Sequence, residues 1–420
     1  MASDWGEISL AAVMDVKHGF AFPGANIRDE PPGDILLTPG NFAIGGGFKG
    51  DKFKYFDGAV PDDYVLNEGD LVVTMTDLSK QADTLGYPAL VPKLRGPRFL
   101  HNQRLGKVLI KRGAELDKGF LFYLLRTAEY RDEVLASATG TTVKHTSPGR
   151  ILAHKATLPP IAEQRAIANI LGVLDDKIEL NRRMNETLEG LARAIFQSWF
   201  VDFDPVRAQR DGLPPPALSP TTAALFPDSF EDSELGKIPM GWKVAKLEEV
   251  AAIQGGKQLP TEDCVSVEKY VVFGANGIMG YTQRATHEGF VIAFGRVGAY
   301  CGSIHWSYNS AWINNNGSAV VPTKWDEYVL QSMLHFDFTS MRTGSAQPFI
   351  PNGSLATAPV IIPGPKIAEA FCRVVHPLRL KQSANELQSQ QLAAIRDALL
   401  PKLLSGEIRV AEAERLVERV

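Results

Sequence analysis

The sequence has few cysteines and no long apolar segment. The 420 residues include only three cysteines, Cys264, Cys301 and Cys372, and no C-x-x-C pair. This spacing excludes a zinc ribbon or a dithiol redox motif, so each cysteine is expected to be reduced and buried. No stretch reaches the roughly eighteen apolar residues of a membrane span, and the N-terminus lacks the basic and apolar regions of a signal peptide. We therefore expect a cytosolic protein.

An excess of positive charge, the usual feature of a protein that binds nucleic acid alone, is also absent. The chain has 44 basic and 48 acidic residues. Residues 1–158 carry 19 of each sign and residues 237–365 carry 9 of each, whereas residues 159–236 carry 7 basic and 13 acidic residues. A DNA-binding role would therefore require basic side chains gathered on one face, or a partner that neutralises phosphates.

Catalytic motifs are missing as well. The glycine-rich segment GGGFKG (Gly45–Gly50) lacks the Gly-Lys-Ser/Thr ending of a phosphate-binding loop, and FGANG (Phe273–Gly277) is not a dinucleotide fingerprint. No Asn- or Asp-Pro-Pro-aromatic segment of an amino-methyltransferase occurs. The eight histidines show no H-x-x-x-H spacing, so no metal site is expected. The chain is predicted not to be an enzyme.

The chain contains an internal repeat, which organises the remaining features. Trp5, Leu10, Val13 and Gly19 recur as Trp242, Leu247, Val250 and Gly256. Further along, GTTVKHTSPGRILAHKATLPP (Gly140–Pro160) parallels GSAQPFIPNGSLATAPVIIPG (Gly344–Gly364). Short apolar runs bounded by Gly, Pro or Asn predict strands at 70–75, 106–111, 289–294 and 317–322, and amphipathic helices are expected around 121–136 and 328–341. Each copy is therefore interpreted as an α+β unit.

A long helix follows each unit. Apolar residues alternate in steps of three and four, as in the seam of a coiled coil. Polar breaks coincide in the two copies, with Asn181 matching Lys381 and Asn185 matching Asn385. The predicted seam residues are Leu171, Leu174, Ile178, Asn185, Leu188, Ile195, Trp199, Leu378, Asn385, Leu392, Ile395 and Leu399. An alternative is that each helix packs only on its own unit, but this does not explain the shared polar breaks.

These patterns divide the chain into two α/β domains in tandem pseudo-repeat, separated by two long antiparallel helices that form a coiled coil. The expected segments are domain 1 at 1–158, a central helix at 159–203, a proline-rich linker at 204–241, domain 2 at 242–364, a C-terminal helix at 365–405 and a tail at 406–420.

Three segments resemble the specificity subunits of type I restriction-modification systems. The segment LPPIAEQRAIANILGVLDDKIELNRRMNETLEGLARAIFQSWFVDFDPVRA (Leu158–Ala208) is similar to their central conserved region. ALFPDSFEDSELGKIPMGW (Ala224–Trp242) resembles the entry to their second half, and IRDALLPKLLSGEI (Ile395–Ile408) is similar to their C-terminal conserved end.

The resemblance implies two target recognition domains, each reading one half of a split target in double-stranded DNA. It also implies two methyltransferase subunits, which use S-adenosylmethionine, and motor-nuclease subunits, which use ATP and Mg²⁺, while the specificity subunit itself needs no cofactor and catalyses nothing. At about 1.5 Å per residue, a helix over 171–200 would span about 45 Å. One turn of DNA is about 34–36 Å, so such helices could set the spacer between two half-sites.

Base reading requires side chains that present hydrogen bonds to base edges, chiefly Arg, Lys, Asn and Gln. The candidates lie in predicted loops and are Lys80, Gln81, Arg95, Arg98, Gln103, Arg104, Lys144, His145, Gln283, Arg284, Arg296, Asn314, Asn316, Arg342 and Gln347. Asn102 and Asn315 occupy similar places in the two copies, so they are expected to serve the scaffold rather than specificity.

Two other functions stay open from the sequence alone. The chain could be an assembly scaffold that holds methyltransferase subunits without reading DNA, although the full-length second copy argues against this. It could also be a stand-alone enzyme that acts on nucleic acid, but no acid-base or metal constellation supports such an activity.

Overall fold

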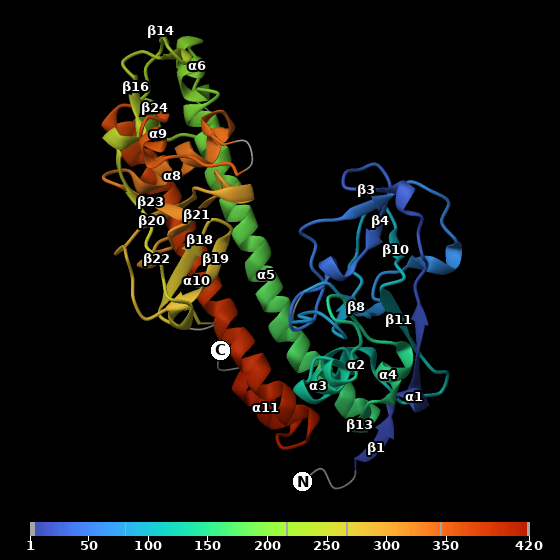
Figure 1. Ribbon diagram of the computed structural model, residues 1–420. Helices are drawn as coiled ribbons and strands as arrows, with labels where there is room; N and C mark the ends of the chain where they lie inside the picture. Colours follow the sequence, from blue (N-terminus) through green and yellow to red (C-terminus); the bar gives the residue numbers. More distant parts are fainter. Residues whose placement is uncertain (1–4, 80, 216, 266–267, 345–346, 418–420) are drawn as a thin grey trace. The chain divides into compact units, whose positions relative to one another are not determined.

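The computed structural model describes residues 5–79, 81–215, 217–265, 268–344 and 347–417 (Figure 1). The chain forms two compact units. Unit 1 comprises residues 1–181 and 386–420, and unit 2 comprises residues 182–385. The two longest helices, α5 (Ile161–Phe200) and α10 (Pro365–Leu404), are therefore each shared between the units. None of the described helices is long and apolar enough to cross a membrane.

Unit 1 contains a four-stranded antiparallel sheet in the order β2-β11-β7-β9 and a second sheet in the order β3-β5-β4-β10-β6. Its strands are β1 (Gly6–Ser9), β2 (Met14–His18), β3 (Ile27–Arg28), β4 (Asp34–Leu37), β5 (Lys54–Phe56), β6 (Val65–Leu66), β7 (Leu71–Thr74), β8 (Thr76–Asp77), β9 (Pro88–Leu90), β10 (Phe99–His101), β11 (Leu105–Ile110), β12 (Lys144–His145) and β13 (Lys155–Leu158). Its shorter helices are α1 (Leu10–Val13), α2 (Lys118–Leu124), α3 (Ala128–Ala136), α4 (Pro148–Ala153) and α11 (Val410–Val417).

Unit 2 repeats this plan with a sheet in the order β17-β23-β20-β21 and another in the order β19-β18-β22. Its strands are β14 (Phe230–Ser233), β15 (Gly236–Pro239), β16 (Lys243–Lys246), β17 (Ala251–Gly255), β18 (Tyr270–Gly274), β19 (Gly277–Thr282), β20 (Val291–Gly295), β21 (Ile304–Ser307), β22 (Ala311–Ile313), β23 (Gly317–Pro322) and β24 (Pro359–Ile362). Its shorter helices are α6 (Asp204–Arg210), α7 (Pro220–Ala223), α8 (Asp326–His335) and α9 (Asn352–Ala356).

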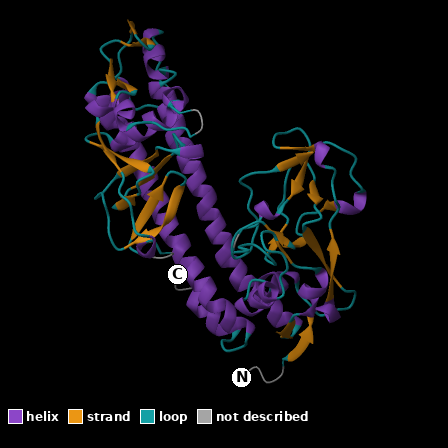
Figure 2. Ribbon diagram, viewed as in Figure 1, coloured by secondary structure: helices purple, strands orange, loops and turns teal. Residues whose placement is uncertain are grey.

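The four-stranded sheets of the two units correspond strand for strand, whereas the second sheet has five strands in unit 1 and three in unit 2. β2, β11, β7 and β9 match β17, β23, β20 and β21, and the only parallel pairings are β4 with β10 in unit 1 and β18 with β22 in unit 2 among the described strands. The closing pair of β1 with β13 likewise matches that of β16 with β24. The predicted tandem α+β fold is confirmed, with sheets and helices in both units (Figure 2).

The halves of α5 and α10 pack against each other in antiparallel orientation inside each unit (Figure 1). In unit 1, Asn181 Nδ2 donates a hydrogen bond to Gln388 Oε1 at 3.0 Å. In unit 2, Asn385 Nδ2 donates to Asn185 Oδ1 at 2.8 Å. The same helices also pack on the strand-rich parts, because Leu171 and Leu399 belong to the core of unit 1 and Phe196 to that of unit 2. Pairing between helices and packing on the domains therefore occur together.

Several boundaries differ from those expected from the sequence. The helix expected around 121–136 is two helices, because Thr127 caps the start of α3 through its side chain. The helix expected around 328–341 ends at His335. The expected linker at 204–241 is built into unit 2, where Val206 and Phe226 are buried in the core. Apolar side chains at these two positions give the proline-rich segment enough burial to fold onto the unit.

Candidate nucleic-acid interface

A tight turn follows β10 in unit 1 and β22 in unit 2. In unit 1 the Leu105 amide donates to the Asn102 carbonyl at 2.9 Å, and in unit 2 the Gly317 amide donates to the Asn314 carbonyl at 2.9 Å. A Cβ atom added to Gly19 or Gly256 would collide with the carbonyl oxygen of Asn102 or Asn314, respectively. The recurring glycine is therefore required by the close approach of this turn.

These contacts correct the pairing of the two asparagines. Asn102 corresponds to Asn314, and not to Asn315 as the sequence comparison suggested. Asn102 Oδ1 accepts the Arg104 amide at 2.9 Å, and Asn314 Oδ1 accepts the Asn315 amide at 2.7 Å. Both side chains are therefore engaged with their own turn, and this removes Asn314, which is also buried, from the side chains available to bases.

Two further loops of unit 1 are joined to this turn by hydrogen bonds. The Met75 amide donates to the Arg104 carbonyl at 2.8 Å, and the Thr146 amide donates to the Met75 carbonyl at 3.0 Å. β12 pairs with β8, so that Lys144 lies opposite Asp77. The loop after β7, the turn at 102–105 and the hairpin at 139–146 therefore form one edge, which we call reading edge 1.

Unit 2 assembles the same three loops in the same way. The Arg296 amide donates to the Asn316 carbonyl at 3.0 Å, and the Ile350 amide donates to the Arg296 carbonyl at 3.0 Å. Bridges join Phe349 to Val297 and to Thr343, as His145 is joined to Thr139 in unit 1. The loop after β20, the turn at 314–317 and the segments 342–344 and 347–350, which are joined by the bridge of Thr343 with Phe349, form reading edge 2.

The structure divides the predicted base-reading residues into two groups. One group belongs to the loops of the reading edges and consists of Gln81, Gln103, Arg104, Lys144, His145, Arg296, Asn314, Asn316, Arg342 and Gln347. Lys80 lies outside the described residues. The other group, Arg95, Arg98, Gln283 and Arg284, lies elsewhere, and three of its members are engaged by carboxylates. Arg98 forms an ion pair with Asp34 at 2.6 Å, Arg284 pairs with Asp263, and Gln283 donates to Glu268.

The side chains on the two reading edges differ although their backbones match. Gln103 and Arg104 of edge 1 are replaced by Asn315 and Asn316 on edge 2, and all four are exposed. Arg296 of edge 2 is half-buried. Its Nη2 donates to the Asn315 carbonyl at 3.0 Å, and its guanidinium group lies over the Phe349 ring at 5.9 Å. Two similar frames thus carry different sets of hydrogen-bonding groups.

Asp77 and Arg150 stabilise reading edge 1 through hydrogen bonds. Neither residue was among the candidates predicted from the sequence. The buried Asp77 carboxylate accepts the Ser79 amide at 2.6 Å and the Thr84 hydroxyl at 2.6 Å. Burial alone would raise the pKa of Asp77, but these hydrogen bonds outweigh it and lower the pKa. Arg150 Nη1 donates to the Thr139 hydroxyl at 3.4 Å. An aspartate followed two residues later by a serine is a local signal that could have indicated this loop.

The predicted helix seam can be located in each unit separately. In unit 1, Leu171, Leu174, Leu392 and Leu399 are buried, and Ile178 and Ile395 are half-buried against the core. In unit 2, Trp199 and Asn385 are buried, and Asn185, Leu188, Ile195 and Leu378 are half-buried. Lys381, expected to match the buried Asn181, is exposed. Arg379, two residues before Lys381, is buried instead, because acidic side chains neutralise its charge.

A charged cluster joins the helices to the strand-rich part in each unit. In unit 1, Asp175 of α5 pairs with Arg126 at 2.8 Å and with Arg396 of α10 at 2.6 Å. Burial alone would raise the pKa of Asp175, but the two guanidinium groups outweigh it and hold the pKa below its ordinary value. In unit 2, Arg379 of α10 pairs with Glu327 of α8 at 3.1 Å and with Glu189 of α5. We call these clusters junction 1 and junction 2.

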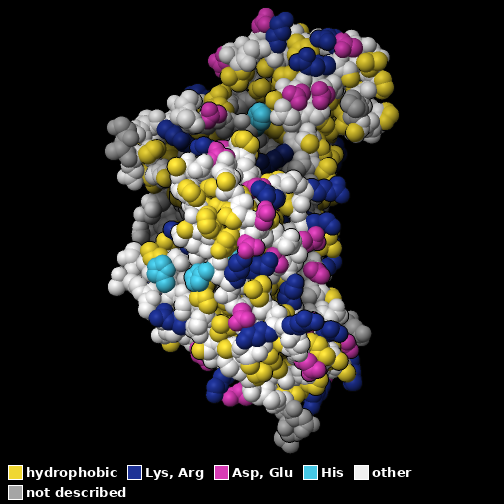
Figure 3. Space-filling model, turned by 90° about the vertical axis from the view of Figure 1, so that its right-hand side faces the viewer, with side chains coloured by type: hydrophobic (Ala, Val, Ile, Leu, Met, Phe, Trp, Pro, Cys, Tyr) yellow, Lys and Arg dark blue, Asp and Glu magenta, His cyan; other side chains and the backbone are white. Residues whose placement is uncertain are grey.

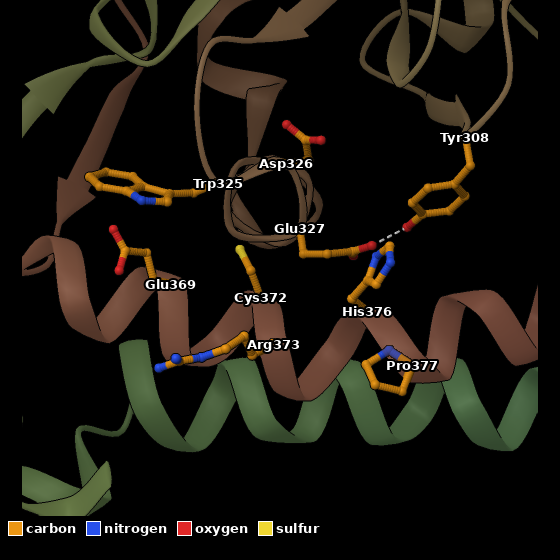
Figure 4. Close-up of a pocket in the computed structure, with 9 residues that line it drawn as sticks. All are labelled: Tyr308, Trp325, Asp326, Glu327, Glu369, Cys372, Arg373, His376 and Pro377. Atoms are coloured by element: carbon orange, nitrogen blue, oxygen red, sulfur yellow. Dashed lines mark hydrogen bonds between the residues drawn. The ribbon is translucent and has the colours of Figure 1, made fainter. Parts of the chain in front are cut away.

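A cavity of about 620 Å³ adjoins junction 2 (Figure 4). It lies between the start of α8 and the face of α10 that points away from α5. The Tyr308 hydroxyl, which also lines the cavity, donates a hydrogen bond to Glu327. Its lining residues are Tyr308, Trp325, Asp326, Glu327, Glu369, Cys372, Arg373, His376 and Pro377. Within the described part of the chain, no group of His, Cys, Asp or Glu side chains could hold a metal ion.

The surface agrees with the balanced charge of the sequence. On the face drawn in Figure 3, basic and acidic side chains are interspersed, and neither sign forms one continuous patch. This face offers no extended basic groove that could hold a DNA backbone without help from another protein.

Comparison with known proteins agrees with the resemblance of the three segments. Residues 2–190 match the family of the type I restriction modification DNA specificity domain. The chain is 25% identical over 366 residues to the specificity subunit of the type I restriction enzyme MjaIX from Methanocaldococcus jannaschii, which covers 78% of this chain and 76% of that protein. It is 27% identical over 359 residues to the HindI specificity subunit from Haemophilus influenzae, covering 69% and 77%. The chain is a homologue of type I restriction-modification specificity subunits.

The fold of these subunits is shared over the whole chain. The crystal structure of a type I restriction-modification system S subunit from M. genitalium matches 96% of this chain and 96% of its own, with a TM-score of 0.57 and 18% sequence identity. The tandem units with their long shared helices are therefore the architecture of a specificity subunit.

Proposed function

We propose that the chain is the DNA-recognition subunit of a type I restriction-modification complex, and that each reading edge contacts one half of a split target. One observation carries this proposal. Three loops form the same hydrogen-bonded frame in both units, while the exposed side chains on the frame differ. A conserved frame with different hydrogen-bonding groups is what two readers of different sequences require.

In this proposal the chain itself has no catalytic activity and binds no cofactor. Two methyltransferase subunits, which use S-adenosylmethionine, dock on the helical regions, and motor-nuclease subunits that use ATP and Mg²⁺ can join them. The balanced charge of the chain supports the need for such partners, because they would supply much of the phosphate neutralisation. The continuous helices α5 and α10 would fix the spacer between the two half-sites.

Arg104→Ala and Arg296→Ala test the proposal in the complex of the chain with its methyltransferase subunits. Each arginine lies on one reading edge, so each variant should weaken binding of the cognate duplex by about 1–3 kcal/mol and relax the sequence preference in one half only. The target is first obtained by sequencing methylated bases in a host that carries the complex, and binding is then measured by gel shift.

Arg95→Ala is a matched control, because Arg95 is exposed but lies outside the reading edges. A uniform loss on all sequences with a smaller salt dependence would assign Arg104 and Arg296 to phosphates. A complex that methylates DNA without any sequence preference would instead support the role of an assembly scaffold and overturn the proposal.

A further inference from the structure

Three large apolar side chains are exposed beside reading edge 2. Ile278 is 61% exposed, Met279 56% and Tyr300 53%. Ile278 and Met279 are consecutive residues of β19, and Tyr300 lies in the loop after β20. Single exposed apolar residues are common on protein surfaces, but a group of them beside a binding edge indicates a contact with a partner.

The segments that carry the three residues lie at the same end of β20. Met279 Sδ lies 3.3 Å from Asn314 Nδ2, at the turn of reading edge 2. A Cβ atom added to Gly295 would lie 2.6 Å from the Tyr300 carbonyl oxygen and 2.7 Å from that of Ala275. The loop that carries Tyr300 and the turn that leads into β19 therefore converge at the end of β20, where Arg296 begins the reading loop.

Polar groups of a defined kind adjoin this apolar patch. Asn315 and Asn316 are exposed on the turn next to Met279. An asparagine amide can donate to and accept from the edge of adenine in the major groove, and an apolar side chain can contact the C5 methyl group of thymine. An A·T pair presents both features side by side, so the combination of exposed amides and an apolar patch suits that pair.

We propose that Ile278, Met279 and Tyr300 contact the C5 methyl group of a thymine in the half of the target that unit 2 reads. This inference rests on the proposed function and adds the chemistry of one recognised base. Reading edge 1 provides a contrast, because Leu78 is the single exposed large apolar side chain described in its loop after β7. Dependence on a base methyl group is therefore expected to be stronger in the half read by unit 2.

The test uses duplex DNA in which deoxyuridine, which lacks only the methyl group, replaces thymine. The complex of the full chain with its methyltransferase subunits first selects its target from a duplex library with random half-sites. Each thymine of the selected target is then replaced in turn, and the dissociation constant is measured. We expect a loss of about fourfold for at least one thymine in one half, which is the effect of removing one buried methyl group.

The variants Met279→Ser, Ile278→Ser and Tyr300→Ser should bind the thymine and deoxyuridine duplexes with more nearly equal affinity. Leu235→Ser is the matched control, because Leu235 is 49% exposed in the hairpin of β14 and β15 and should preserve the fourfold ratio. Circular dichroism of each variant checks that it folds.

The possible outcomes separate the two proposals. Failure to select any sequence would overturn the proposed function together with this inference. Selection of a split target that tolerates deoxyuridine at every position, or whose second half contains only G·C pairs, would leave the function intact and overturn the thymine contact. A methyl dependence that the three variants leave unchanged would also overturn it, because another residue would then make the contact.

Discussion

Each unit links its long helices to the rest of the unit through a charged cluster, but the central charges of the two clusters are opposite. Junction 1 has a carboxylate, Asp175, between two arginines, whereas junction 2 has an arginine, Arg379, between two carboxylates. The central group lies on α5 in unit 1 and on α10 in unit 2. Each unit therefore has an ionic link between its helices and the rest of the unit, and a central charge of either sign can provide this link when its partners carry the opposite sign.

Among the variants that test this comparison, Arg379→Met should have the largest effect on the unfolding free energy. Arg379 is 1% exposed and Glu327 is 3% exposed, so the variant leaves a buried carboxylate without its charged partner. We expect unit 2 to lose about 3–5 kcal/mol of unfolding free energy. Five of the six tryptophans lie in unit 2, so urea unfolding followed by tryptophan fluorescence reports on this unit.

Arg193→Met is the control for Arg379→Met. Arg193 also pairs with Glu189, at 2.9 Å, but its side chain is 58% exposed, and the expected loss is below about 1 kcal/mol. Equal losses for the two variants would show that burial does not determine the strength of junction 2.

Asp175→Asn tests junction 1 and should have a smaller effect, of about 2–3 kcal/mol, because Asp175 is more exposed than Arg379. The lowered pKa means that ionised Asp175 stabilises unit 1 above the pKa of the unfolded chain. This contribution is lost as the pH falls through the folded-state pKa, and the variant should therefore lack that part of the acid sensitivity. Hydrogen exchange of α2 and the first half of α5 measures the change, and an unchanged acid profile would contradict it.

The sequence predicted features that repeat or that are local. The recurring anchors around Trp5 and Trp242 predicted the duplicated plan, and the three-four spacing predicted the long helices, because both patterns reflect burial along a single segment. Most of the candidates chosen from loops rich in polar residues lie in the loops of the two reading edges, and their contact with bases stays a prediction. The helix and loop signals depend only on neighbouring residues, and the repeat is found by comparing the sequence with itself, so none of these signals requires coordinates.

Features that depend on distant partners could not be predicted. Arg98 and Arg284 seemed as available as Arg104, because their partners Asp34 and Asp263 are far away in the sequence. The two junctions join three separate segments each and have no local signature. The burial of the proline-rich segment was missed for the same reason, since its apolar residues are too few to show periodicity.

His101 in unit 1 and Ile313 in unit 2 occupy corresponding positions, and only the histidine can bind a proton as the pH falls. They precede the corresponding turns, and the buried His101 Nε2 lies 3.0 Å from the Leu105 carbonyl. Burial lowers the pKa of His101 to about 4. The unfolded chain therefore binds the proton more readily, so stability is complete above about pH 6.5 and is lost as the pH falls towards 4.

We expect amide exchange of residues 99–106 to rise by about tenfold between pH 6.5 and pH 5 after correction for the intrinsic rate, while that of residues 311–318 stays constant. His101→Ile, which installs the residue of unit 2, should remove the difference. An equal rise in both segments would show that protonation of His101 is not its cause.

Removal of the polar pair from the helix seam should have the smallest net effect on the unfolding free energy. Asn385 is buried and donates to Asn185 Oδ1 in unit 2, so changing Asn385 alone to leucine removes this hydrogen bond and should cost about 1 kcal/mol or more. Changing both to leucine replaces the polar pair by apolar contact, and the unfolding free energy should stay within about 1 kcal/mol of the original.

Because a buried asparagine fixes register rather than stability, the double variant should show its defect in the pairing of α5 with α10. Disulfide trapping between cysteines placed at 188 and 382 and at 188 and 378 would measure it, since a fixed register favours one pair and a slipped register populates both.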